Sequence, residues 1–266
     1  MREFIEGMIA TERAVCPVCG EQQYKDINIA EEGCEEVWVR MRAICTCEYE
    51  KRQEAERTIK RLERQSRIDY LKRRHLPEKR LHGFTFDADD RPKSEASIIC
   101  RRYVDRWQTV KEKGYGLLLH GNVGTGKTFY AACIVNAMIE KGIAAELTTI
   151  TRLINTIAIE NRDVALAELN RLPLIVIDDL GAERQTEYSR EMAFTVIDER
   201  IKSKRPLIVT TNLSPDEMVQ ADDMSQLRTY ERVLEACPIR VGLTGRSRRR
   251  SDDKQNVETA MKDLFS

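Results

Sequence analysis

Short apolar runs and amphipathic stretches alternate along the chain from about residue 94 to residue 243. The apolar runs are rich in Leu, Ile and Val, which is typical of buried strands, and they lie at 116–120, 144–149, 173–178, 206–211 and 238–243. Helical patterns fill the intervals and predict helices over 94–111, 127–141, 151–170, 186–204 and 214–236. Strands separated by helices favour an α/β fold with a parallel, doubly wound, five-stranded sheet.

A different pattern precedes residue 94. Residues 48–74 contain no glycine or proline and have only a sparse apolar stripe, so we expect an exposed connecting helix. Pro77 and residues 82–92 then predict a loop or linker. The first 47 residues are polar and acidic and hold five of the eight cysteines, which indicates a small separate unit.

Composition limits the class of protein without deciding it. The chain has 266 residues, 41% of them hydrophobic and 33% charged, which is enough apolar material for a core. Lys plus Arg and Asp plus Glu both number 44, so net charge argues neither for nor against nucleic acid. Basic clusters at 51–80 and 240–250 are either solvated faces or sites of phosphate contact.

Targeting signals do not stand out in the sequence. No apolar run is long enough to span a bilayer, and the N-terminus lacks the apolar core of a secretion signal. We therefore expect a cytoplasmic protein without a membrane partner, whose cysteines stay reduced.

The most specific motif follows the first predicted strand. The sequence GNVGTGKT at 121–128 fits G-x-x-x-x-G-K-[ST], in which glycines let backbone N–H groups turn toward phosphate oxygens. A glycine turn without a ligand is the alternative, and the strand before it and the helix after it disfavour that alternative. We expect Lys127 to reach the β- and γ-phosphates and Thr128 to ligate Mg²⁺, at a positive helix N-terminus. The predicted nucleotide-binding residues are Gly121, Asn122, Val123, Gly124, Thr125, Gly126, Lys127 and Thr128.

Two later strands end in polar residues that suit the same ligand. Asp178 and Asp179 end the apolar run at 174–177, at the edge where doubly wound sheets bind ligands. We expect Asp178 to hold Mg²⁺ through its hydration shell and Asp179 to polarise the attacking water. Asn212 ends the next strand and could contact the γ-phosphate or that water. The alternatives are an ordinary Asp-Asp turn and an asparagine that only forms a turn.

The N-terminal cysteines have the spacing of a metal site. Cys16 and Cys19 form one close pair, and Cys45 and Cys47 form a second pair after a hairpin-length insert. Four thiolates can hold a tetrahedral Zn²⁺, and a segment this small and polar could hardly fold without one. The C-x-C spacing of the second pair is shorter than the C-x-x-C spacing that is usual there, so free thiols stay an alternative. Cys34 is the spare cysteine and could replace a ligand.

These motifs together resemble a known family of ATPases. GNVGTGKT, LIVIDDLGAE and LIVTTNLS look like the Walker A, Walker B and sensor-one elements of AAA+ ATPases. More narrowly, they resemble the DnaC/DnaI-type helicase loaders and the related IstB-type transposition helpers, over roughly residues 80–250. That branch lacks the helical lid of most AAA+ proteins, so the resemblance implies a lidless P-loop domain.

The resemblance also implies arginines that act on the nucleotide. Arg232 stands where the family has an arginine finger that reaches the site of a neighbouring subunit. Arg248 or Arg249, in an element similar to the family's closing G-x-S-x-R, would contact nucleotide in the same chain. One departure is Asp179, where many AAA+ proteins have glutamate. It suggests a slow, switch-like ATPase rather than a fast motor.

Contact with DNA is the weakest of the implied properties. In the family, a helical element between the second and third strands lines a channel for single-stranded DNA. Here that element would be residues 151–171, which contain no aromatic residue for base stacking. Its polar candidates for backbone contact are Arg152, Asn155, Arg162 and Asn170.

The resemblance leads to a functional hypothesis with two rivals. We expect an ATP-dependent loader that binds a replicative hexameric helicase and delivers it to single-stranded DNA, assembling as a homo-oligomer on the helicase. The expected cofactors are ATP, Mg²⁺ and Zn²⁺. The rivals are an IstB-like transposition helper and an adaptor that binds ATP without hydrolysis. The expected parts are a zinc-binding, helicase-interaction domain at 1–50, a connector at 51–93, an ATPase domain at 94–250 and a tail at 251–266.

Overall fold

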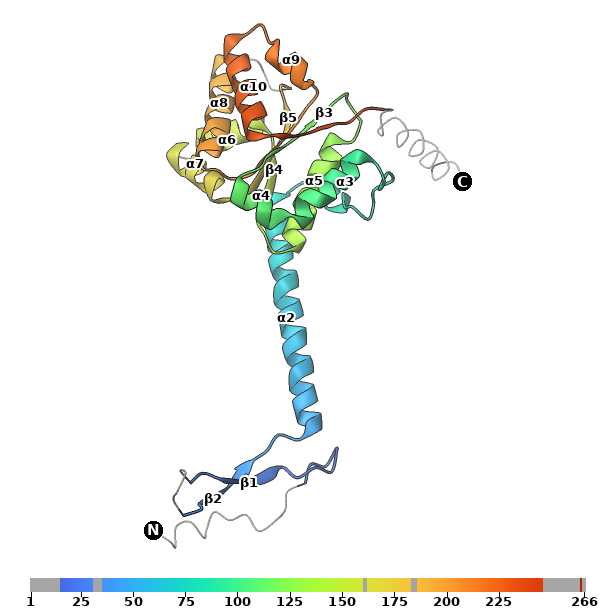
Figure 1. Cartoon of the computed structure of the whole chain (residues 1–266), viewed down its shortest axis with the longest axis vertical. Helices are drawn as coiled ribbons and strands as arrows, with labels where there is room; N and C mark the ends of the chain where they lie inside the picture. Colours follow the sequence, from blue (N-terminus) through green and yellow to red (C-terminus); the bar gives the residue numbers. More distant parts are fainter. Residues whose placement is uncertain (1–14, 31–34, 160–161, 183–185, 246–263, 265–266) are drawn as a thin grey trace. The chain divides into compact units, whose positions relative to one another are not determined.

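The chain forms two compact units, Met1–Ser66 and Arg67–Ser266. The computed structural model describes residues 15–30, 35–159, 162–182, 186–245 and 264 (Figure 1). The long helix α2 (Thr46–His75) begins in the first unit and ends in the second. No described helix combines the length and the apolar composition that a membrane crossing requires.

The first unit contains an antiparallel hairpin of β1 (Tyr24–Asn28) and β2 (Trp38–Arg42). Facing residues of such a hairpin share one side of the sheet. One side holds the pairs Lys25–Met41 and Ile27–Val39, and the other holds Tyr24–Arg42, Asp26–Arg40 and Asn28–Trp38. Every residue of both strands is exposed, so the described part of the hairpin has no buried core.

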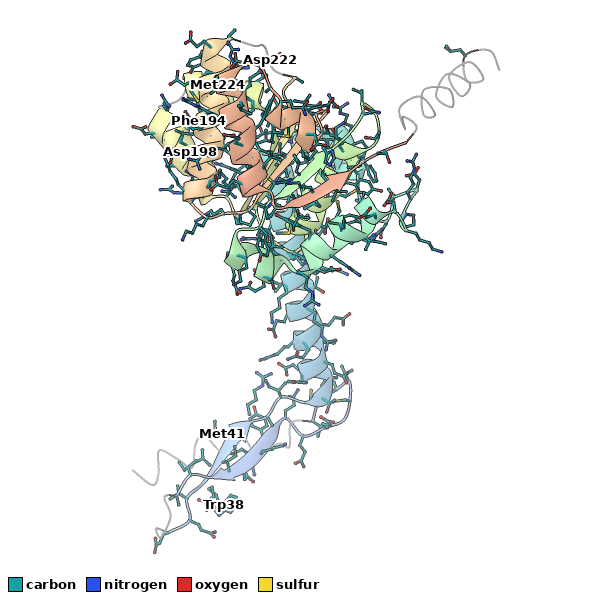
Figure 2. All side chains as sticks on the ribbon, turned by 45° about the horizontal axis from the view of Figure 1, so that its top comes forward. Trp38, Met41, Phe194, Asp198, Asp222 and Met224 are labelled. Atoms are coloured by element: carbon teal, nitrogen blue, oxygen red, sulfur yellow. The ribbon has the colours of Figure 1, made fainter. Side chains whose placement is uncertain are left out.

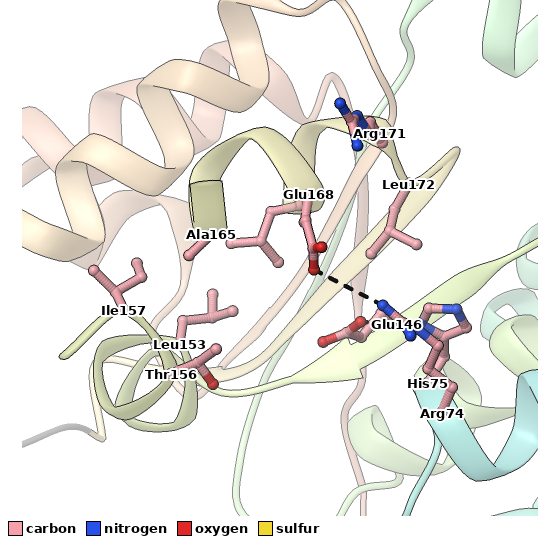
Figure 3. Close-up of a pocket in the computed structure, with 11 residues that line it drawn as sticks. Arg74, His75, Glu146, Leu153, Thr156, Ile157, Ala165, Glu168, Arg171 and Leu172 are labelled. Atoms are coloured by element: carbon pink, nitrogen blue, oxygen red, sulfur yellow. Dashed lines mark hydrogen bonds and ion pairs between the residues drawn. The ribbon is translucent and has the colours of Figure 1, made fainter. Parts of the chain in front are cut away.

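Helix α2 confirms the helix predicted at 48–74. Its first part is exposed and rich in charge, whereas Ile68, Leu71 and His75 near its end are buried in the second unit. His75 Nδ1 lies 3.1 Å from Glu146 Oε2, and Arg74 forms a 3.8 Å ion pair with Glu168 (Figure 3). The apolar residues that this helix buries therefore lie near its end, which belongs to the second unit.

A cavity of about 430 Å³ lies beside this end of α2. Its apolar lining comes from residues such as Leu153, Ile157 and Leu172, and charged side chains edge it (Figure 3). No residue of the predicted phosphate loop lines it. We therefore locate the nucleotide site from the motif and its contacts rather than from this cavity.

The second unit contains a five-stranded parallel sheet, as the sequence predicts, and its strands lie in the order β4-β5-β6-β3-β7. Strands that alternate with helices along the chain pair in parallel here because each helix returns the chain to the same edge. The strands are β3 (Leu117–His120), β4 (Ala145–Thr148), β5 (Leu174–Leu180), β6 (Leu207–Thr211) and β7 (Ile239–Gly242).

Helices cover both faces of this sheet (Figure 1). The end of α2, the 3-10 helix η1 (Lys79–Gly83), α3 (Glu95–Asp105), α4 (Trp107–Lys113) and α5 (Lys127–Glu140) pack on one face. The other face is covered by α6 (Ile150–Ile159), α7 (Arg162–Arg171), α8 (Glu187–Lys202), α9 (Pro215–Val219) and α10 (Met224–Ala236). Leu118 and Leu119 enter opposite cores, because side chains of a strand alternate between faces.

Two local features differ from the sequence prediction. The helix predicted over 94–111 is broken at Arg106, where φ −96° and ψ 23° leave the helical region, and Trp107 starts a second helix. Tyr103 before the break and Trp107 after it both belong to the core on this face of the sheet. The strand predicted at 173–178 extends to Leu180, and its register against β6 shifts between Ile177 and Leu180.

Candidate nucleotide site and zinc centre

The phosphate loop joins β3 to α5 in a conformation that requires glycine. Gly121, Gly124 and Gly126 have φ values of 132°, 81° and 107°, which other residues rarely adopt. A Cβ at Gly121 would lie 2.2 Å from the carbonyl oxygen of Leu243, so close packing also excludes a side chain there. The pattern of glycines that identifies the motif is thus explained by backbone geometry.

The remaining loop residues lead directly into a helix. Asn122 and Val123 are exposed, whereas Thr125 is buried and its hydroxyl donates a 2.8 Å hydrogen bond to the Asn122 carbonyl. Helix α5 begins at Lys127, immediately after the loop. Backbone N–H groups at such a helix N-terminus favour anions, which fits the predicted phosphate site.

Lys127 joins the loop to the end of another strand. Its buried ammonium donates hydrogen bonds to the carbonyl oxygens of Gly121 at 2.7 Å and Asn122 at 2.9 Å. It also donates to Oδ1 of Asn212 at 2.7 Å, across 85 residues of sequence. The structure therefore brings together the predicted phosphate-binding lysine and the predicted sensing asparagine, although Asn212 itself is exposed.

Asp178 and Thr128 form the predicted magnesium pair. The Thr128 hydroxyl donates to both carboxylate oxygens of Asp178, at 3.1 and 3.0 Å. Burial raises the pKa of the Asp178 carboxyl, because desolvation disfavours its charged form, and hydrogen bonds from Thr210 and Thr128 oppose that shift. Carboxylate and hydroxyl oxygens side by side suit Mg²⁺, so these donors fit the expected ion.

Asp179 has an unusual backbone at the end of β5. Its φ of 54° places a non-glycine residue in the left-handed region, which is uncommon although aspartate tolerates it better than most residues. Its side chain is exposed, on the strand segment where the register shifts. Such backbone strain recurs at functional sites. Asp178 is buried whereas Asp179 is exposed, so the two carboxyl groups lie in different environments.

Thr210 is a site residue that the sequence analysis does not single out. Its hydroxyl donates to Asp178 Oδ1 at 2.6 Å and accepts from the backbone N–H of Asp179 at 2.9 Å. One signal could have found it. Asn212 follows β6 directly, two residues after Thr210, and alternate residues of an extended chain point to the same side.

Comparison with known proteins places this site in a family. The family described as IstB-like ATP binding protein matches residues 47–256, which include the phosphate loop, β5 and β6. The chain belongs to this family. The resemblance inferred from the motifs is confirmed, and the fold, with its five-stranded parallel sheet, agrees with it.

Individual relatives carry two different names. The chain is 30% identical over 207 residues to the replicative helicase loader DnaI of Bacillus subtilis, covering 71% of this chain and 66% of that protein. It is 32% identical over 163 residues to a putative insertion sequence ATP-binding protein of Sinorhizobium fredii, covering 59% of this chain and 51% of the relative. The chain thus spans between half and two thirds of these relatives.

A solved structure shares the fold of the second unit. The crystal structure of the DnaC helicase loader superimposes with a TM-score of 0.54 at 25% identity, covering 62% of this chain and 99% of that one. The IstB-like domain therefore shares its fold with a helicase loader and its sequence pattern with an insertion sequence ATP-binding protein.

Arg232 of this IstB-like chain lies on α10, where it pairs with acidic side chains. Its guanidinium is 3.3 Å from Asp198 on α8, labelled in Figure 2, and 2.7 Å from Glu235 on α10. The side chain is 41% exposed, so it is accessible to a neighbouring subunit. Contact with a neighbour's nucleotide stays a prediction. Arg248 and Arg249 lie outside the described residues.

Replacing Arg232 with alanine should separate catalysis from binding. We expect unchanged ATP affinity and a turnover about a thousandfold lower, because an arginine finger stabilises charge only during phosphoryl transfer. Loss of two surface ion pairs should change the free energy of unfolding little, because solvent screens exposed charges. Steady-state ATPase assays would test this prediction. The control is Arg228→Ala, which lies one turn earlier on α10. A loss confined to Arg228→Ala would contradict the assignment.

The four predicted zinc ligands meet in the first unit. The Sγ atoms of Cys16, Cys19, Cys45 and Cys47 all lie within 4.8 Å of one another. Those of Cys16 and Cys47 are 3.4 Å apart and those of Cys45 and Cys47 are 3.3 Å apart. Sulfur atoms bound to one tetrahedral Zn²⁺ lie about 3.8 Å apart, so the arrangement fits a zinc site. Cys34, the spare cysteine, lies outside the described residues.

Electrostatics in this cluster favour at least one thiolate. Backbone N–H groups of Cys19 and Val18 lower the pKa of the Cys16 thiol to about 6. Hydrogen bonds with neighbouring thiols raise the pKa of Cys47, because four sulfur atoms so close cannot all be charged without a cation. A divalent metal ion would remove that conflict.

Glu21 supports the cluster in a way that spacing alone could not predict. Its carboxylate accepts hydrogen bonds from both the backbone N–H and the hydroxyl of Thr46, each at 2.7 Å. Glu21 lies two residues after Cys19, and Thr46 lies between Cys45 and Cys47. The bonds thus tie the two cysteine pairs together and cap the start of α2.

The candidates for DNA contact lie on two consecutive helices. Arg152 and Asn155 are exposed on α6, whereas Arg162 and Asn170 share a groove on α7 with acidic side chains of Asp163 and Glu199. The Arg162 guanidinium donates to the Thr195 hydroxyl at 3.3 Å. The structure therefore divides the four candidates between two surfaces, and DNA contact stays a prediction.

Proposed function

We propose that this chain is an ATP-dependent loader that binds a replicative hexameric helicase and delivers it to single-stranded DNA. The main support for this proposal is that one chain contains both a unit with a four-cysteine cluster and an IstB-like ATP-binding domain. Relatives named replicative helicase loader, in Bacillus subtilis and Escherichia coli, support it. In this proposal the first unit recognises the helicase and the second responds to nucleotide.

The second unit would act as a slow ATPase. Lys127 would hold the β- and γ-phosphates, and Thr128 with Asp178 would hold Mg²⁺, which when bound neutralises phosphate charge. Asp179 would orient and polarise the attacking water, and Asn212 would respond to the γ-phosphate through its bond with Lys127. Subunits assembled on the helicase would complete each site with Arg232 from a neighbour.

One side of the hairpin offers a surface for the helicase. Ile27, Val39 and Met41 are 45%, 37% and 51% exposed, and pairing places them on the same side. Ile29 and Val37, joined by a backbone hydrogen bond, extend this apolar surface. Apolar patches on small soluble units mark protein contacts, so we assign the helicase to this side. Figure 2 labels Met41, which belongs to it, and Trp38, which belongs to the opposite side, called the polar side because Asp26, Asn28, Arg40 and Arg42 lie on it.

An acidic residue on the apolar side should disrupt the complex. We expect Ile27→Asp to weaken binding to the replicative helicase by more than about tenfold, because a buried unpaired charge opposes docking. Tyr24→Asp, on the same strand but on the polar side, is the matched control and should bind normally. Co-migration of each full-length variant with the purified helicase in gel filtration gives the answer. Equal binding by both variants would refute this surface.

A transposition helper is the second candidate, and the match to an insertion-sequence protein favours it. Such a protein would co-migrate with a transposase on DNA and would not bind the helicase. A third candidate, an adaptor that only binds ATP, would bind the helicase without measurable turnover. The helicase binding assay and an ATPase assay on the same preparation therefore separate all three.

A further inference from the structure

Thr210 contacts both acidic residues of the proposed ATPase site, the carboxylate of Asp178 and the backbone N–H of Asp179. It is fully buried on β6, between the sheet neighbours β5 and β3. Its single hydroxyl donates to Asp178 Oδ1 at 2.6 Å and accepts from the Asp179 N–H at 2.9 Å. Both bonding roles of the hydroxyl are therefore used by adjacent acidic residues.

The second bond compensates for an irregularity in the sheet. Regular pairing of β5 with β6 holds up to Ile177 and resumes at Leu180, so Asp178 and Asp179 lie in the shifted segment. There the N–H of Asp179 bonds to a side chain instead of the neighbouring backbone. Because Asp179 also has a positive φ, this bond helps hold a conformation that would otherwise relax.

The same strand continues into the group that contacts Lys127. Asn212 follows Thr210 by two residues and accepts from the Lys127 ammonium at 2.7 Å, while Thr128 donates to Asp178. β6 and the residue that follows it therefore contact the phosphate loop through Asn212, and the carboxylate of Asp178 and the backbone of Asp179 through Thr210. A shift of β6 would change both the contact of Asn212 with Lys127 and the contact of Thr210 with Asp178, since both contacts are short and polar.

We infer that Thr210 is a positioning residue that fixes the metal-binding carboxylate of Asp178 and the backbone of Asp179, and so couples both to β6, the strand that leads directly into Asn212. The inference rests on the proposed ATPase function. Thr210 does not touch nucleotide itself. Its hydroxyl hydrogen sets the direction of the Asp178 carboxylate. Its hydroxyl oxygen holds the backbone N–H of Asp179 and so sets the position of that residue.

A neighbouring threonine provides a matched control. Thr211 is also fully buried on β6, and its hydroxyl donates to the carbonyl oxygen of Leu180 at 2.8 Å. It makes no bond to either aspartate among the described contacts. Replacing either threonine with valine removes one buried hydroxyl at nearly constant volume, so general destabilisation should be similar in the two variants.

The experiment compares full-length Thr210→Val, Thr210→Ser and Thr211→Val. Binding of a fluorescent ATP analogue is titrated with Mg²⁺, and ATP turnover and thermal unfolding are measured in parallel. We expect Thr210→Val to bind the analogue normally without metal but to need about ten to a hundred times more Mg²⁺ for the metal-dependent gain, as for other residues that orient metal ligands. Turnover should fall by a similar factor. Thr210→Ser should restore both, and Thr211→Val should change neither.

The outcomes separate this inference from the proposed function. Wild-type Mg²⁺ dependence in Thr210→Val, or an equal shift in Thr211→Val, would overturn the role of Thr210. Absence of turnover in the wild-type protein would refute the ATPase, while the Mg²⁺ titration would still decide the role of Thr210. If Thr210→Val does not fold, Thr210→Cys replaces it, and its weak thiol should give a smaller shift in the same direction.

Discussion

We expect the Lys127→Ala variant to lose nucleotide binding. The ammonium is buried among oxygen atoms of the loop and Asn212, so no other described side chain is placed to replace it at the loop. Charged hydrogen bonds contribute about 1.5 to 3 kcal/mol each, and loss of two phosphate contacts should weaken binding more than a hundredfold. Isothermal titration with ATP and Mg²⁺ measures this directly.

The control for this variant lies at the other end of the same helix. Lys141 follows α5, and its ammonium donates to the Val104 carbonyl at 2.9 Å, so Lys141→Ala removes a cation far from the loop. We expect normal ATP binding in that variant and similar thermal unfolding in both. An affinity for ATP close to wild type in Lys127→Ala would disprove the assignment of the phosphate loop.

Loss of a zinc ligand should unfold the first unit. The described hairpin has no buried side chain in either strand, so its fold depends on the cysteine cluster at its open end. Structural zinc contributes about 10 to 16 kcal/mol to folding in small domains, far more than an exposed hairpin gains by itself. We expect about one zinc per wild-type chain and almost none in Cys45→Ser.

Elemental analysis gives the zinc content, and hydrogen exchange over residues 15–45 reports the fold. Cys100→Ala is the control, because Cys100 is a buried core residue of α3 and should leave zinc and exchange in the first unit unchanged. Full zinc content in Cys45→Ser would show that the cluster is not the metal site. The second unit should keep ATP binding in both variants.

Much of the second unit could be predicted because its signals are local. Runs such as 174–177 identify buried strands by composition, and the order of strands and helices restricts the sheet to parallel pairing. Glycine at 121, 124 and 126 marks the loop because few other residues adopt the required φ values. The break at Arg106 could not be predicted, since no glycine or proline marks it in the sequence.

The zinc unit shows where sequence pattern reaches its limit. Spacing was sufficient to group the four cysteines, because metal ligands recur at short intervals. The contact between Glu21 and Thr46 spans 25 residues and follows no periodicity. Likewise, which residues of the hairpin share a side depends on register, and a slip by one residue would exchange the two faces.

Short patterns in the amino-acid sequence were enough to predict the class of fold, the phosphate loop, the cysteine cluster and the resemblance to an IstB-like ATPase. Each of these is encoded in short patterns whose chemistry does not depend on distant residues. Only the tertiary structure decided that Lys127 meets Asn212 and that Thr210 holds both Asp178 and Asp179. Those contacts depend on which strands are neighbours and where their register shifts, and packing of the whole sheet sets both.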